Sequence, residues 1–339
     1  MSKILHLTIF LLSLNILSLN AQSINYRLTE FNSQLKKSEF LLFLAKNYSS
    51  NGFSILDKKT YDYYIKWATG KNHDGILRNY ATIIHETCHL VNDDIGGFWS
   101  KGYYISPKIE IKVSKSKVFK SSELDKNIPE KWKMNIFRYK TYIQESNEEE
   151  KIASVSEGIY GLLDEFDAYY QSTRAVVELY DYYKTIASYS EPSYWTLYIS
   201  NCYSSIFAYH EFNLFIAWYL KYAKKNHPEI YISIIKNKEL KIAFTLIDNG
   251  YKSVIQQYFN NRNSILDKIN KAGIRKAEIS DKYFLITSKG KKGNISKGYG
   301  IPDGDITYLN SLYTKEDFQM LKLFGIDKLS ETNYKVFLK

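Results

Sequence analysis

The residues whose types and spacing can do chemistry lie between His85 and His89, in the sequence His-Glu-Thr-Cys-His. On a helix, residues four positions apart lie on one face, so these two imidazoles can bind one metal ion. Glu86 then lies beside the metal, where a carboxylate can act as a base toward a metal-bound water. The pattern predicts a zinc site, and its context must support that hypothesis because such motifs also arise by chance.

The surrounding residues predict the helix that this spacing requires. Asp74 and Gly75 are typical of a helix start, and Asn92 to Gly97 are typical of a helix end. Between them, one face is buried because its residues recur at helical spacing: Ile76, Tyr80, Ile83, Ile84, Thr87, Cys88 and Val91. The alternative is a helix with two solvated or core histidines and an accidental glutamate.

A catalytic zinc needs a third protein ligand and one open position. No histidine follows His89 at short range, so a carboxylate is the natural choice. In the predicted helix Ser156–Tyr170, Glu165 falls about 90° from the centre of the apolar face, whereas Glu157 falls nearly opposite that centre and Asp164 faces solvent. Glu165 is therefore the expected ligand and Glu157 the alternative.

The motif His85 to His89, together with Glu165 in Leu-Asp-Glu-Phe-Asp-Ala-Tyr, resembles the zincin metallopeptidases of the gluzincin type. The resemblance covers two helices rather than the whole chain. It implies that two histidines and one glutamate hold zinc, that Glu86 is the base, and that peptide bonds are hydrolysed. It also implies that a strand beside the cleft binds an extended peptide, for which Tyr103–Val113 and Trp132–Ile143 are the candidates.

Peptide hydrolysis by this chemistry needs a hydrogen-bond donor for the oxyanion besides zinc. Tyr169, one turn past Glu165, and His210 are the candidates, although each can equally be a packed or hydrogen-bonded side chain. Carboxylates are also expected to orient the zinc-bound imidazoles. Asp93 and Asp94 are candidates for this role, and both can equally be solvated charges at a helix end.

The N-terminus predicts export. Residues 1–21 contain one charge, Lys3, then the apolar run Ile9–Leu19 and a small residue at Ala21, which is the layout of a secretory signal peptide. An uncleaved anchor is the alternative. No other stretch is apolar enough to cross a bilayer. We therefore expect a secreted, periplasmic or cell-envelope protein that is not an integral membrane protein after signal cleavage.

Composition is that of a globular protein, with 45% hydrophobic and 24% charged residues. The formal charge of +10 is neither dense nor patterned enough to indicate a nucleic-acid partner. Four lysines and four glycines in Ser288–Gly300 predict a mobile basic hairpin loop. That loop is a candidate for docking to an anionic envelope surface, or is simply solvated.

The chain contains two cysteines, Cys88 and Cys202. In an exported protein they can form one disulfide, or each can be a small buried side chain. Cys88 lies inside the motif but points away from the midline between the two histidines, so it is not expected to bind zinc.

The predicted fold is a predominantly helical, zincin-like α+β fold with a small sheet. Residues 22–275 form the expected metallopeptidase domain, and residues 276–339 a C-terminal subdomain of hairpin and helix. The expected strands are Tyr103–Val113, Trp132–Ile143 as its candidate partner, and Tyr283–Thr287 before the basic hairpin. The expected helices besides that of the motif are Ser38–Asn47, Thr60–Thr69, Ile152–Ile186, Tyr194–Lys225, Asn226–Asn249, Gln256–Lys271 and a last one capped by Thr314.

Two functions fit these patterns. The first is a secreted zinc peptidase acting on a peptide or protein substrate. The second is a non-catalytic cell-envelope binding protein on a zincin-like scaffold. Glu86 favours the first, because a structural zinc needs no base and usually has four protein ligands.

Overall fold

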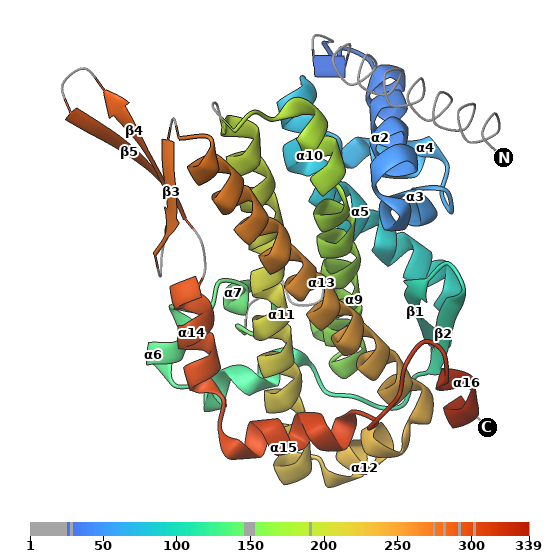
Figure 1. Ribbon diagram of the computed structural model, residues 1–339. Helices are drawn as coiled ribbons and strands as arrows, with labels where there is room; N and C mark the ends of the chain where they lie inside the picture. Colours follow the sequence, from blue (N-terminus) through green and yellow to red (C-terminus); the bar gives the residue numbers. More distant parts are fainter. Residues whose placement is uncertain are drawn as a thin grey trace, which may run out of the picture.

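The computed structural model describes residues 26–27, 30–145, 153–189, 192–273, 275–280, 283–290, 293–300 and 303–338. The predicted signal peptide, residues 1–21, lies outside this part of the chain. Helices dominate the described residues, which also contain two small antiparallel sheets (Figure 1). The predominantly helical α+β class is therefore confirmed.

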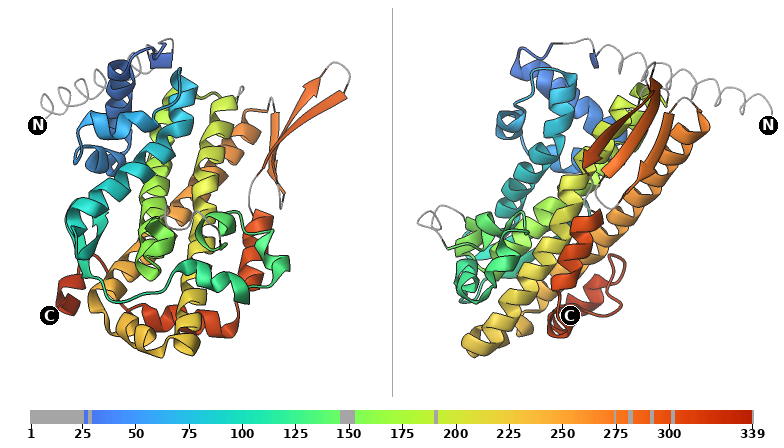
Figure 2. Two further views of the ribbon diagram at one scale, coloured as in Figure 1. Left: turned by 180° about the vertical axis from the view of Figure 1, so that it is seen from behind. Right: turned by 90° about the vertical axis from the view of Figure 1, so that its left-hand side faces the viewer.

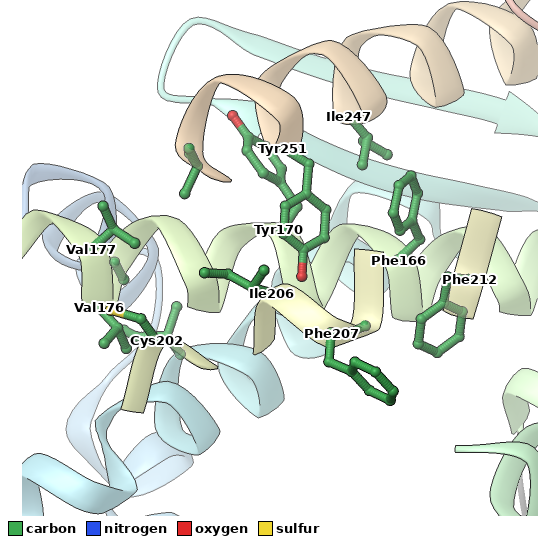
Figure 3. Packing of buried hydrophobic residues seen from close by; sticks show 14 of the residues in the cluster. Phe166, Tyr170, Val176, Val177, Cys202, Ile206, Phe207, Phe212, Ile247 and Tyr251 are labelled. Carbon is green, nitrogen blue, oxygen red and sulfur yellow. The ribbon is translucent and has the colours of Figure 1, made fainter. Parts of the chain in front are cut away.

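Three long helices form the centre of the molecule: α9 (Ile159–Glu178), α11 (Ser193–Asn226) and α13 (Lys238–Lys271). Figure 3 shows aromatic and aliphatic side chains from all three packed together, with Phe166, Ile206 and Ile247 among them. The predicted break between Asn249 and Gln256 is wrong, because α13 runs through it without interruption.

A glycine lies within α13 because another helix approaches closely there. A Cβ atom at Gly250 would lie 2.5 Å from the hydroxyl oxygen of Tyr170 on α9. Only glycine leaves room for this aromatic ring, and the neighbouring packing compensates for its low helix propensity.

The motif helix is α5 (His73–Gly96), which packs along α9. Its first turn is capped by the side chain of Asn72, which accepts a hydrogen bond from the backbone N–H of Gly75, and Gly97 follows the last turn with a φ of 70°. Both predicted ends of this helix are confirmed to within a few residues. The predicted buried face is also confirmed, since all seven of its residues are buried.

The expected single strand Tyr103–Val113 is wrong. The chain instead forms a hairpin of β1 (Ser100–Ser106) and β2 (Ile109–Ser114), with a turn at Pro107 and Lys108 that interrupts the alternation. The hairpin lies against the end of α5, where a Cβ atom at Gly102 would lie 2.3 Å from the carbonyl oxygen of Asn92.

The expected partner strand Trp132–Ile143 is also wrong. This segment contains the end of the short helix α6 (Glu130–Lys133) and the short helix α7 (Tyr139–Tyr142). Long-range contacts hold it in place rather than a strand partner, as the buried ion pair of Arg138 with Glu211 on α11 illustrates.

The remaining elements surround this centre. On the N-terminal side they are α2 (Gln34–Tyr48), α3 (Ser50–Leu56), α4 (Tyr61–Tyr64), η1 (Ile65–Trp67), η2 (Ser121–Asn127) and α8 (Ala153–Ser156). Later in the chain come α10 (Tyr180–Ile186), α12 (Pro228–Lys236), β3 (Arg275–Ile279), β4 (Tyr283–Gly290), β5 (Gly293–Gly300), α14 (Asp303–Leu312), α15 (Lys315–Phe324) and α16 (Tyr334–Leu338).

The sheet β3-β4-β5 follows α13 and stands out from the helical body (Figure 2). A hairpin is found at the predicted position. The described residues of Ser288–Gly300 lie in the end of β4 and in β5 rather than in a long loop. Thr314 caps α15 in a reciprocal capping box with Asp317, as predicted. None of the described helices combines the length and apolar character that a membrane crossing requires.

Candidate metal centre

Three predicted ligands converge where α5 meets α9. His85 Nε2 and His89 Nε2 lie 3.1 Å apart, and Glu165 Oε2 lies 3.4 Å from the first and 3.6 Å from the second. Zinc–ligand bonds of about 2.0–2.1 Å at tetrahedral angles place neighbouring ligand atoms about 3.3 Å apart. The three atoms have a spacing close to that of three zinc ligands, so the residues fit this metal in both chemistry and spacing.

The three side chains differ in their exposure to solvent. His85 and Glu165 are almost fully buried, whereas 21% of the His89 side chain is exposed. His89 is therefore the member of the three that solvent reaches most easily.

Asp164 orients the imidazole of His89. Its Oδ2 lies 2.9 Å from His89 Nδ1, while its Oδ1 accepts a hydrogen bond of 2.9 Å from the Asn92 side chain. A carboxylate on the far nitrogen of a zinc-binding histidine fixes the tautomer and the ring plane. The expectation that Asp164 faces solvent is therefore wrong, because α9 is covered on several sides and this residue is only 6% exposed.

Asp93 and Asp94 do not orient the histidines. Asp94 is paired with Lys59 at the surface, and Asp93 lies 3.6 Å from Lys101. Both carboxylates are solvated charges near the end of α5, which was the alternative for them.

The ionisable groups are strongly coupled. Burial raises the pKa of Glu165, but the hydrogen bonds and charges of the two histidines outweigh it and hold that pKa well below its usual range. Burial lowers the pKa of His89, but the Asp164 carboxylate more than compensates, and the net pKa is raised well above its usual value. An anionic Glu165 is the form that binds a cation.

The ring of His85 is supported differently. It packs at 4.4 Å between centroids against Tyr169, and its Nδ1 has no hydrogen-bond partner among the described residues. Tyr169 therefore lies beside His85, while its role as a donor to the oxyanion stays a prediction. Only one of the two histidines has carboxylate support.

Tyr142 is the site residue that sequence reasoning missed. Its hydroxyl donates a hydrogen bond of 3.0 Å to Glu165 Oε2, the same oxygen that faces the two imidazoles. Behind it, the Arg138 guanidinium lies 4.3 Å from the ring centre of Tyr169 and 2.7 Å from Glu211. Tyr142 lies in a short helix after an irregular segment, so no periodicity in the sequence marks it.

Glu86 is half-buried on α5 and forms no ion pair or hydrogen bond with the part of the chain that the structure describes. On a helix, its side chain projects about 100° from that of His85 and about 60° from that of His89. A carboxylate held beside the ligands and not engaged by a cation is available to accept a proton.

The other candidates lie elsewhere. Glu157, the alternative ligand, is paired with Lys101 and Lys115 at 3.1 Å each. His210 forms a hydrogen bond of 3.0 Å with Asn310 and lines a separate cavity of about 420 Å³ between α11, α13 and α15. The structure therefore does not bring His210 to the metal centre.

The two cysteines are both buried and free, so the disulfide is not formed. Cys202 lies on α11 in the packed core (Figure 3), while Cys88 lies on α5. Cys88 is not part of the metal cluster, as expected, and burial raises its pKa well above the usual value. Both residues act as small core side chains.

The edge of β1 is already occupied at its centre. The backbone N–H of Tyr104 donates to the side chain of Asn92 at 2.8 Å, and its carbonyl accepts from Gln171 at 2.5 Å. An extended peptide cannot pair with this residue, so the expectation that this strand binds substrate is wrong at Tyr104. Burial raises the pKa of Asp167, which also accepts from the Tyr104 N–H, to about 7.

Comparisons of the chain with known protein families, with curated proteins and with solved structures find no match. The function must therefore be inferred from the chemistry of the site itself.

Proposed function

We propose that this protein is a zinc-dependent peptidase in which His85, His89 and Glu165 hold the metal and Glu86 is the general base. One observation carries the proposal: the three ligand atoms lie 3.1, 3.4 and 3.6 Å from one another, at the spacing of zinc ligands. The Asp164–His89 hydrogen bond supports it further, because zinc-bound histidines almost always have such a partner.

Zinc at this site would lower the pKa of a bound water and polarise a substrate carbonyl. Glu86 accepts the proton of the attacking water and delivers it to the leaving amine nitrogen, as a general base and then a general acid. Tyr169, whose ring packs against His85, replaces His210 as the candidate donor for the developing oxyanion, whereas the hydroxyl of Tyr142 already donates to Glu165.

Export completes the proposal. The signal-peptide layout of residues 1–21 would direct the enzyme to a periplasm or beyond, where peptides and proteins are its substrates. The basic hairpin ending in β5 would favour anionic envelope surfaces through its lysines.

Glu86→Gln tests the proposal. The variant protein should retain one zinc per chain and lose hydrolysis of a peptide library by about 10²- to 10⁴-fold. Asp94→Asn, a surface change on the same helix, is the matched control and should keep full activity. Zinc binding by the wild type without any hydrolysis above the Glu86→Gln background would instead support the non-catalytic binding protein.

A further inference from the structure

We infer that Lys101 is a positioning residue for this site, acting on His89 through Asp164; the inference rests on the proposed zinc function. Lys101 Nζ lies 3.0 Å from Asp164 Oδ2, the same oxygen that His89 Nδ1 contacts at 2.9 Å. The lysine belongs to β1, so the hairpin is connected to the metal ligand through a single carboxylate oxygen.

The burial of Lys101 is the first argument for a specific role. Only 6% of the residue is exposed, and burying an ammonium group is costly unless it is paired. Its partners are three carboxylates, those of Asp164, Glu157 and Asp93, the last at 3.6 Å. Lysines at a protein surface do not need such an arrangement.

The carboxylates near the start of α9 also need a cation to balance their negative charge. Glu157, Asp164, Glu165 and Asp167 lie within eleven consecutive residues, and the last three are buried. Lys101 is the buried cation that faces two of the four. Without it, the carboxylates of Asp164 and Glu157 would repel each other across a poorly screened space.

These contacts define how the positioning works. The Asn92 amide holds Asp164 Oδ1, and the ammonium holds Oδ2 in line with His89. Removal of the ammonium frees Oδ2 and lets repulsion from Glu157 turn the carboxylate away from the imidazole. His89 would then lose its fixed ring plane, and zinc would bind more weakly.

The sign of the effect distinguishes this role from a simple field effect. A positive charge near a dication repels it, so a lysine acting only through its charge would weaken zinc binding, and its removal would tighten binding. A positioning lysine predicts the opposite result.

The chain offers a matched control. Lys115 also pairs with Glu157 at 3.1 Å, but it is more exposed and has no contact with Asp164. Lys101→Met and Lys115→Met therefore both remove a partner of Glu157, and only the first disturbs Asp164.

The experiment is zinc affinity of the full-length protein, measured by competition with a chromophoric chelator, together with the visible spectrum of the Co²⁺-substituted protein. Lys101→Met should weaken zinc binding about tenfold and shift the cobalt spectrum, whereas Lys115→Met and Lys101→Arg should do neither. Lys101→Met combined with Asp164→Asn should bind no more weakly than Asp164→Asn alone, because both changes act on one oxygen.

Unchanged or tighter zinc binding by folded Lys101→Met protein would overturn the inference, and so would additive losses in the double variant. If Lys101→Met does not fold, Lys101→Met with Asp93→Asn removes one charge of each sign and keeps the Glu157 carboxylate, so the same weakening is expected. A wild type that binds no zinc would instead defeat the proposed function itself, which is a separate outcome.

Discussion

His89 Nδ1 and Asp164 Oδ2 lie 2.9 Å apart, although 75 positions of sequence separate the two residues. This contact joins α5 to α9 at the candidate metal centre and gives one proposed ligand a fixed orientation. The other histidine, His85, is held by packing against Tyr169 instead. The two imidazoles should therefore respond differently to changes around them.

Asp164→Asn should weaken zinc binding by about 10- to 100-fold, because the neutral amide no longer supports the imidazole as a carboxylate does. Chelator competition measures the effect. Asp94→Asn, which removes the surface ion pair with Lys59, is the control and should leave the zinc affinity unchanged. Equal affinities for the two variants would show that the Asp164 contact has no role in metal binding.

Tyr142→Phe removes only the hydroxyl that donates to Glu165 Oε2, while the ring keeps its packing at 5.1 Å from Phe212. We expect zinc affinity to fall about tenfold, since the carboxylate ligand loses the hydrogen bond that orients it. Tyr139→Phe on the same short helix is the control, because its hydroxyl bonds Asp125 instead. A loss of affinity in both variants would contradict a specific role for Tyr142.

Glu211→Leu leaves the buried guanidinium of Arg138 without its carboxylate at 2.7 Å. The free energy of unfolding should fall by about 3–5 kcal/mol, and Arg138→Met in the same chain should restore most of it. Urea denaturation measures both effects. Asp181→Asn, which breaks an exposed pair with Lys184, should cost less than about 1 kcal/mol. Similar losses for the buried and the exposed pair would refute the prediction.

His210 predicts a pH dependence of stability. Burial lowers its pKa to about 4, and the hydrogen bond with Asn310 opposes this only in part. The unfolded chain, with a histidine pKa near 6.5, binds the proton more readily, so this residue costs stability as the pH falls from about 6.5 to about 4. His210→Gln should remove about 1–2 kcal/mol of that loss, after allowance for the partial exposure of the ring.

Denaturant titrations at pH 7 and pH 4.5 measure the free energy of unfolding of wild type and of His210→Gln. The effect is the difference between the two proteins in how far this free energy falls between the two pH values. His227→Gln, which removes a surface contact of Nε2 with Glu123, is the control variant for the same titrations. Parallel pH dependences for wild type and His210→Gln would contradict the burial argument.

Local patterns predicted the residues of the candidate metal cluster because these depend on spacing within single helices. His85 and His89 are one turn apart, and Glu165 lies at the edge of an apolar face. The same count of angles around the helix was wrong for Asp164. It assumes that one side of the helix faces solvent, whereas α9 packs against α5, α11 and α13. A central helix buries polar residues wherever partners from other segments meet them.

Local sequence patterns could not predict which residues from distant segments contact α9. Lys101 reaches α9 from β1, where buried and exposed residues do not alternate, and Tyr142 reaches it from a short helix without an apolar period. Pro107 was the overlooked signal of the hairpin, because proline is typical of turns and cannot donate to a strand ladder. Tertiary contacts alone determine which side chains meet there.

Anomalous diffraction at the zinc edge, from crystals of the purified protein grown with stoichiometric zinc, tests whether these residues hold the metal. We expect one strong peak about 2.0–2.1 Å from His85 Nε2, His89 Nε2 and Glu165 Oε2, and its loss in Glu165→Gln. No peak at these three atoms, or a zinc ion held by other residues, would contradict it.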